Sequence, residues 1–274
     1  MQSTPSLLLR RLAVSVTVGV LLVAAAGPAG GASASAPQGT LVFASNRTGV
    51  FQIYSVRADG TQLGQLTRGK AADTAPRFSP DGRRIVFSRS PKQYMYDLWV
   101  MNADGSGQRR LAAGGSVPAW SPDSRRIAYV TATGRLVILD VDSPRTVTIL
   151  GRNVNPYWSP DGRLIAFAHE VGDRGYLAVA RGDGSGLKTL RRNAAPIGWS
   201  PQGEIALNVL NTPSIGVIRP NGRGARRLLP FAVSGLAWSP DGRRLASVGG
   251  ELPSTVFTSR RRTAPAYGMS GHWR

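Results

Sequence analysis

One short string recurs five times along the chain and constrains its fold more than any other feature. An aromatic residue is followed by Ser-Pro-Asp-Gly or a close variant, at residues 78–82, 120–124, 158–162, 199–203 and 238–242. The steps between successive aromatic residues are 42, 38, 41 and 39 residues. A period near 40 residues is typical of the four-stranded blade of a β-propeller, so the spacing predicts a propeller.

Each repeat also has the composition of short antiparallel strands joined by tight turns. Proline sets φ for the second position of a turn, aspartate bonds to its own backbone, and glycine accepts a positive φ. An alternating hydrophobic strand follows the turn, as in Ile85/Phe87, and a second turn such as Asp104-Gly105 comes further along. With 33 glycines, 19 prolines and no helical pattern after residue 36, the sequence predicts an all-β chain.

The repeats suggest how the chain is organised. We expect a single domain over residues 35–274, with repeats at about 40–70, 71–112, 113–150, 151–191, 192–229 and 230–258. The first repeat lacks an inner strand, and Thr263-Ala-Pro-Ala-Tyr267 echoes Thr74-Ala-Pro-Arg-Phe78. We therefore predict a six-bladed ring with an irregular last blade, closed by residues 263–267, because closure removes exposed sheet edges. A five-bladed ring and a truncated chain are the alternatives.

Residues 1–34 have the pattern of a signal peptide. Arg10 and Arg11 precede an apolar run of fifteen residues from Leu12 to Ala26, and Ala32-Ser-Ala34 is a small-residue cleavage site. The run is shorter than the roughly 20 apolar residues that span a bilayer, which favours cleavage after Ala34 over a membrane anchor. We therefore expect an exported protein, periplasmic or extracellular, with no transmembrane span after cleavage.

The composition excludes several kinds of catalytic site. The chain has no cysteine and two histidines, His169 and His272, so thiol nucleophiles, cysteine-ligated zinc and multi-histidine metal sites lack their residues. No Gly-x-Ser-x-Gly nucleophile elbow occurs. Eight of the 15 acidic residues fall in the repeated turns, where they serve the backbone. We expect no cofactor, no metal and no catalytic activity.

The net charge of +19 falls to +17 when Arg10 and Arg11 are removed. For an exported chain this charge points to envelope polymers or lipid surfaces rather than to nucleic acid. Arginine pairs such as Arg83-Arg84 and Arg125-Arg126 are spread out by the repeat, which weakens the case for one polyanion site. A compositional bias toward arginine is the simpler explanation.

The repeated Trp-Ser-Pro-Asp-Gly string and the hydrophobic strand after it resemble the repeats of TolB-like β-propellers, which are related to the WD-type blade. The resemblance covers roughly residues 40–258. It implies a propeller, commonly six-bladed and often exported, that serves mostly as a platform for protein–protein contacts. We therefore expect a monomeric, non-catalytic scaffold that binds an envelope or extracellular protein. Charge-driven binding of an anionic polymer or lipid is one alternative, and a propeller hydrolase or lyase is another.

In such a propeller, the connections between strands two and three and those between strands four and one share one face around the channel mouth. Function concentrates on loops of this kind. Tyr94 and Tyr96 resemble a protein-binding loop, since tyrosine and arginine favour interface hot spots. His169 beside Glu170 has the composition of an acid–base pair, although an ordinary loop histidine is the commoner explanation. The predicted partner-binding residues are Asp73, Arg89, Lys92, Tyr94, Tyr96, Asn153, Asn155, His169, Glu170, Asp173, Arg174 and Asn193.

Overall fold

The computed structural model describes residues 39–92, 95–143, 145–149, 152–231, 233 and 235–248. All regular secondary structure in these residues is β-strand, and the strands form six antiparallel sheets that we call blades 1 to 6 in chain order. This confirms the predicted all-β fold of four-stranded blades. The predicted signal peptide and the predicted closing strand (263–267) lie outside the described residues.

The first three blades occupy the N-terminal half of the described chain. Blade 1 contains β1 (Thr40–Ser45), β2 (Gln52–Arg57) and β3 (Gly64–Gln65). Blade 2 contains β4 (Ala72–Phe78), β5 (Arg84–Lys92), β6 (Met95–Asn102) and β7 (Arg109–Ala112). Blade 3 contains β8 (Gly115–Trp120), β9 (Arg126–Thr131), β10 (Leu136–Asp140) and β11 (Thr146–Ile149).

The remaining blades follow the same order. Blade 4 contains β12 (Arg152–Trp158), β13 (Leu164–Val171), β14 (Arg174–Arg181) and β15 (Lys188–Arg192). Blade 5 contains β16 (Ala194–Trp199), β17 (Ile205–Val209), β18 (Ser214–Ile218) and β19 (Arg226–Leu229). Blade 6 is described by β20 (Gly235–Trp238) and β21 (Leu245–Val248).

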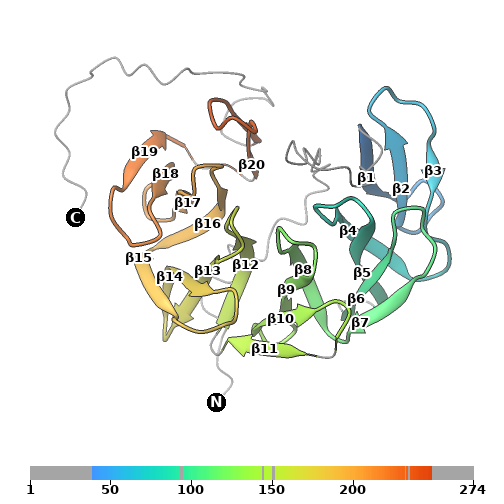
Figure 1. Cartoon of the computed structure of the whole chain (residues 1–274), viewed down its shortest axis with the longest axis horizontal. Helices are drawn as coiled ribbons and strands as arrows, with labels where there is room; N and C mark the ends of the chain where they lie inside the picture. Colours follow the sequence, from blue (N-terminus) through green and yellow to red (C-terminus); the bar gives the residue numbers. More distant parts are fainter. Residues whose placement is uncertain are drawn as a thin grey trace.

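The blades are arranged in an arc around a common centre (Figure 1). Strands β4, β8, β12 and β16 lie nearest the centre, and β7, β11, β15 and β19 lie on the outside. Blades 1 and 6 form the two ends of the arc, with β1 and β20 on opposite sides of its opening. The number of blades in the complete ring and the way it closes stay predictions.

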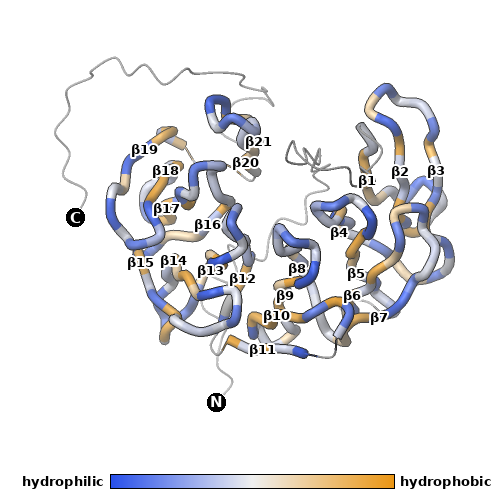
Figure 2. The backbone as a smooth tube through the Cα atoms, in the orientation of Figure 1, coloured by the Kyte–Doolittle hydropathy of each residue, from blue (hydrophilic) through white to orange (hydrophobic). Residues whose placement is uncertain are grey.

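The core lies between the faces of neighbouring blades. Val86 of blade 2 packs with Ile127 and Tyr129 of blade 3, whereas its neighbour Ile85 packs with Ile53 of blade 1. Successive side chains of a strand point to opposite faces of its sheet, so alternate ones enter different interfaces between blades. Burying each such side chain contributes about 1.5–3 kcal/mol. Along the backbone, hydrophobic stretches lie on the strands and hydrophilic ones at many of the turns (Figure 2).

The Ser-Pro-Asp-Gly string forms the turn between the first and second strand of a blade. In blade 2, the Ser79 hydroxyl donates to Asp81 Oδ1 at 2.6 Å and accepts from the Arg84 amide at 2.9 Å. Asp81 also accepts from the Arg83 amide at 3.1 Å. The same serine–aspartate bond forms in blades 3, 4 and 6. These bonds confirm that the repeated aspartates serve the turns.

Three of the repeated tryptophans join their blade to the one before it. Their indole N–H groups donate to carbonyl oxygens on the preceding inner strand: Trp120 to Arg77 at 3.1 Å, Trp158 to Ala119 at 3.1 Å and Trp199 to Tyr157 at 2.9 Å. Each indole therefore contributes a buried hydrogen bond as well as apolar area. The interpretation of these tryptophans as structural residues is confirmed.

Candidate functional site: the inner wall and the loop face

The inner strands of blades 2, 3 and 4 share a bulge. The residue before proline in each strand has left-handed backbone, with φ of 51° at Ala75, 52° at Val117 and 53° at Asn155. A non-glycine residue there costs about 1–3 kcal/mol, and a residue before proline normally prefers extended backbone. The bulges interrupt the ladders between Thr74 and Arg77, Ser116 and Ala119, and Val154 and Tyr157.

The bulges present side chains to solvent at the inner wall. Val117 is 45% exposed, Ala75 is exposed and Asn155 is partly exposed. Bulges of this kind redirect side chains and concentrate beside functional sites. Of the predicted residues, Asn155 belongs to this wall.

Two long polar side chains lie two residues further along these strands, directly before the repeated aromatic residue. Arg77 holds this position in blade 2 and Tyr157 holds it in blade 4. Burial lowers the pKa of Arg77 and raises the pKa of Tyr157, and each acts electrostatically on the other. Sequence reasoning missed both residues. The signal that finds them is the small size of the corresponding residues in the other repeats: Ala119, Gly198 and Ala237.

Asp73 and Arg89, both predicted to bind a partner, instead bind each other. They are paired across β4 and β5. Arg89 Nε lies 2.7 Å from Asp73 Oδ1 and Arg89 Nη2 lies 2.8 Å from Asp73 Oδ2. The Asp73 side chain is 1% exposed, and the Arg89 guanidinium stacks 4.4 Å above the Trp99 ring. The structure therefore places the Asp73 carboxylate inside the protein, whereas the Arg89 side chain stays 16% exposed.

His169 belongs to strand β13 and is 7% exposed, so it is not a loop residue. Its ring meets Phe167 edge-on at a centroid distance of 6.2 Å. Burial lowers the pKa of His169, and the neighbouring charge of Glu170 opposes this effect. Glu170 in turn lies 3.7 Å from the Arg152 guanidinium. The pair is held in the blade and offers little surface for acid–base chemistry.

The other predicted residues divide into three groups. Asp173 and Arg174 are exposed at the hairpin between β13 and β14, and Tyr96 is partly exposed near the start of β6. Asn193 connects blades 4 and 5 through its backbone, donating to the Gly175 carbonyl and accepting from the Leu210 amide, both at 2.8 Å. These bonds place the connection between blades 4 and 5 on the same face as the hairpins between the second and third strands of those blades. Tyr94 and the side chains of Lys92 and Asn153 lie outside the described residues.

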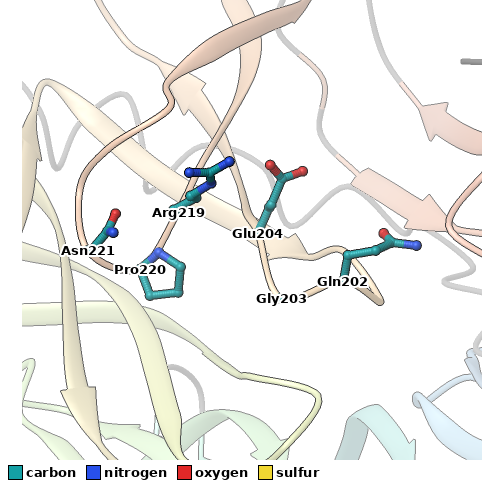
Figure 3. Close-up of a pocket in the computed structure, with 6 residues that line it drawn as sticks. All are labelled: Gln202, Gly203, Glu204, Arg219, Pro220 and Asn221. Carbon is teal, nitrogen blue, oxygen red and sulfur yellow. The ribbon is translucent and has the colours of Figure 1, made fainter.

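A shallow pocket of about 480 Å³ lies on the opposite face, in blade 5 (Figure 3). It is lined by Gln202, Gly203 and Glu204 from the first turn and by Arg219, Pro220 and Asn221 from the second. In blades 2, 3 and 4 the amide at the position of Pro220 donates to the first turn, as Gly182 does to the Arg163 carbonyl at 2.8 Å. Proline has no N–H, so blade 5 lacks this bond between its turns.

The preceding blade also leaves this pocket open. Arg126 of blade 3 donates to the Gly182 carbonyl of blade 4 at 2.6 Å, and Arg84 of blade 2 donates to the Asp142 carboxylate of blade 3 at 3.1 Å. Blade 4 has Leu164 at this position, which is too short and has no donor. Glu204 is bound within blade 5 by Arg226, at 2.5 and 2.7 Å. The pocket therefore follows from two local departures from the repeat.

The comparison with protein families decides the identity of this repeat. The TolB beta propeller domain matches residues 2–203 of the chain, which is more than half of its length. The chain belongs to this family.

Individual relatives share this TolB-like character over part of their length. The protein TolB homolog of Chlorobium luteolum is 29% identical over 153 residues, a match that covers 39% of this chain and 35% of that protein. The chain thus spans about a third of the length of this curated relative.

Solved structures share the fold. An oligogalacturonate lyase in complex with manganese superimposes with a TM-score of 0.62 at 17% identity, over 78% of this chain and 68% of the lyase. TolB from Acinetobacter baumannii superimposes with a TM-score of 0.60 at 15% identity, over 77% of this chain and 58% of that protein. Identities this low establish a common propeller fold and no common chemistry.

Within the described ranges, no three histidine, aspartate or glutamate side chains gather in a way that could hold a metal ion. The described part of this TolB-like chain also has no helix long and apolar enough to cross a bilayer.

Proposed function

We propose that this TolB-like propeller is an exported, non-catalytic scaffold of the cell envelope that binds a partner protein through its inner wall and loop face. The observation that carries the proposal is the exposed bulge repeated in β4, β8 and β12. Strained backbone persists where the surrounding structure enforces it, and such strain concentrates at functional sites. Three equivalent bulges around one axis form a shaped wall that an inserted segment can contact.

Apolar exposure on the loop face supports the same proposal. Met95 is 61% exposed beside Tyr96, and Val171 is 52% exposed beside the Asp173 hairpin. Exposed apolar side chains rimmed by polar ones are typical of protein-interaction surfaces. The predicted residues on this surface are Tyr96, Asn155, Asp173, Arg174 and Asn193, and Lys92, Tyr94 and Asn153 stay predictions.

An affinity capture with two matched variants tests the proposal. The purified protein is immobilised, exposed to an envelope extract at about 0.1 M and about 0.5 M sodium chloride, and the bound material is identified by mass spectrometry. Val117→Asp alters the inner wall, and Val147→Asp alters a valine of similar exposure (42%) on the outer strand β11. We expect one protein to stay bound at high salt, to be lost with Val117→Asp and to be kept with Val147→Asp.

Two outcomes overturn the proposal. If anionic polymer or lipid alone is recovered, and salt releases it, then the positive charge of the chain drives the binding. If the two valine variants retain the protein partner equally well, the inner wall is not part of the interface. Export is tested separately by N-terminal sequencing of the secreted protein, which we expect to begin at Ser35.

A further inference from the structure

The pocket of blade 5 contains two backbone carbonyl groups that lack the donors found in the other blades. Because Pro220 has no N–H, the Gly203 carbonyl does not receive the bond that the Gly182 amide makes in blade 4. Among the residues that the structure describes, no hydrogen-bond donor reaches the Pro220 carbonyl either. Both residues line the pocket, on the two turns that face each other across it (Figure 3). The pocket therefore offers acceptors to a ligand that brings donors.

Two other blades show which donor fits at the position of the Pro220 carbonyl. In blade 3 the equivalent Val141 carbonyl accepts from Arg109 Nη2 of blade 2 at 2.8 Å. In blade 4 the equivalent Gly182 carbonyl accepts from Arg126 Nη1 of blade 3 at 2.6 Å. The two guanidinium groups come from different strands of the preceding blade and bind the same carbonyl position. The repeat therefore indicates a guanidinium as the group that this position accepts.

Blade 4 has lost both of the arginines that could make this contact with blade 5. Leu164 stands where blade 3 has its arginine, and a leucine side chain has no donor. Lys188 holds the position of Arg109 on the outer strand. Its ammonium donates to the Asn221 carbonyl at 3.2 Å, one residue beyond Pro220. The described part of the chain therefore supplies no guanidinium to the Pro220 carbonyl.

The charges around the pocket resemble those around the occupied site in blade 4. One arginine stands on the second turn in each blade, Arg181 in blade 4 and Arg219 in blade 5. One carboxylate stands near each site as well, from Asp183 in blade 4 and from Glu204 in blade 5. Blade 4 binds the guanidinium of Arg126 in these surroundings. A guanidinium that enters the blade 5 pocket therefore meets a comparable balance of charge, and salt screens the repulsion between exposed cations.

We infer that the blade 5 pocket is a receptor for a guanidinium group of another molecule, carried by an arginine residue of a protein or by a free guanidino compound. The guanidinium donates to the Pro220 and Gly203 carbonyls, with the Glu204 carboxylate beside it. Its five N–H donors in a planar fork allow two carbonyls to be bound at once. A pocket of about 480 Å³ falls within the size range of small-ligand sites. Because this pocket lies on the face opposite the loop face, the inference is independent of the proposed function.

The test follows the backbone amide resonances of the purified, isotope-labelled protein by NMR while four probes are added. Three are blocked tripeptides, Gly-Arg-Gly, Gly-Lys-Gly and Gly-citrulline-Gly, and the fourth is free arginine. Lysine keeps the charge without the fork, and citrulline keeps the shape without the charge. We expect the arginine peptide to shift the resonances of Gly203, Asn221 and Gly222. The lysine peptide is expected to bind about fivefold more weakly, since it makes fewer hydrogen bonds, and the citrulline peptide more weakly still.

Substitutions in blade 4 separate occupation of the pocket from a general effect of charge. Leu164→Arg supplies a guanidinium from within the chain, so the arginine peptide is expected to bind about tenfold more weakly or less. Leu187→Arg adds the same charge at an exposed position (45%) on the turn before β15, and is expected to change binding less than about twofold. Leu164→Gln is too short to fill the pocket and keeps the binding of the wild type. Thermal denaturation verifies that each variant is folded.

Three outcomes overturn the receptor: no shift at Gly203 and Asn221 with the arginine peptide, equal binding of the arginine and lysine peptides, or equal weakening by Leu164→Arg and Leu187→Arg. The comparison with free arginine identifies the source of the guanidinium once the receptor is supported. Tighter binding of the peptide indicates an arginine residue of a protein, and tighter binding of free arginine indicates a small guanidino compound.

Discussion

Arg89 donates two hydrogen bonds of 2.7 and 2.8 Å to Asp73, and this pairing buries the Asp73 carboxylate that the sequence places on the loop face. The pair also has neighbours that fix it: the guanidinium lies over the rings of Phe87 and Trp99, at 5.2 and 4.4 Å from their centroids, and donates to Gln108 at 3.0 Å. Gln108 bonds onward to the Leu66 carbonyl of blade 1 at 3.3 Å. The ion pair therefore contributes to the junction between blades 1 and 2.

Removing the carboxylate tests this structural role. Asp73→Ala leaves the Arg89 charge without its partner in a largely buried place, so we expect the free energy of unfolding in urea to fall by about 3–5 kcal/mol. The control is Asp142→Ala, which breaks the exposed pair with Arg84 and costs at most about 1 kcal/mol. The double variant Asp73→Leu/Arg89→Leu is expected to be more stable than Asp73→Ala. Similar losses for Asp73→Ala and Asp142→Ala contradict the structural role.

His169 makes stability depend on pH in the weakly acidic range. Because burial lowers its pKa in the folded protein, the unfolded chain takes up the proton first as the pH falls. The contribution of the neutral imidazole is therefore complete above the unfolded pKa of about 6.5 and is lost as the pH falls from there toward the folded pKa. We expect His169→Leu to flatten the decline in melting temperature between pH 7 and pH 5, which thermal denaturation measures. His272→Gln, the control, leaves the decline unchanged; a decline that persists in His169→Leu rules out this histidine as its cause.

Ser124 occupies the turn position where the other repeats have glycine. Its φ is 61°, and its hydroxyl accepts from the Asp81 amide of blade 2 at 3.0 Å. Ser124→Ala loses the bond and keeps the strain, so we expect a loss of about 1 kcal/mol in the free energy of unfolding. Ser124→Gly also loses the bond but relieves about 1 kcal/mol of left-handed strain, so its stability stays near that of the wild type. Chemical denaturation of the two variants checks this order, and an alanine variant as stable as the glycine variant contradicts it.

Filling the blade 5 pocket is expected to stabilise the propeller. Leu164→Arg restores the side chain that Arg126 contributes in blade 3, and it brings a donor within reach of the Pro220 carbonyl and a cation near Glu204. One added interblade hydrogen bond contributes about 0.5–1.5 kcal/mol. Leu164→Gln makes the side chain polar but leaves it too short to reach the Pro220 carbonyl, so it serves as the control. If Leu164→Arg unfolds no later in urea than Leu164→Gln, the origin assigned to the pocket is wrong.

The fold was predictable because its determinants are local and repeated. Ser79, Asp81 and Gly82 specify one turn within a few residues, and the same turn returns in each later blade. The tryptophan bonds between blades follow from the same register. The spacing of the repeats is therefore enough to find these turns and bonds, because successive blades repeat most of the same interactions.

The candidate site was less predictable because its contacts join residues that no repeat relates. Asp73 meets Arg89 only once the bulge at Ala75 has set the register between β4 and β5. His169 is buried because β13 extends to Val171, whereas the sequence suggests an ordinary loop histidine.

Site-specific photo-crosslinking in the exporting cell tests the central claim most directly. A benzoyl-phenylalanine is placed at position 117 on the inner wall or at position 147 on the outer strand, and crosslinked products are identified by mass spectrometry. A single envelope protein crosslinked from position 117 and absent from position 147 is the predicted result. Crosslinks to the same proteins from both positions, or to none from position 117, would contradict a protein-binding function of the inner wall.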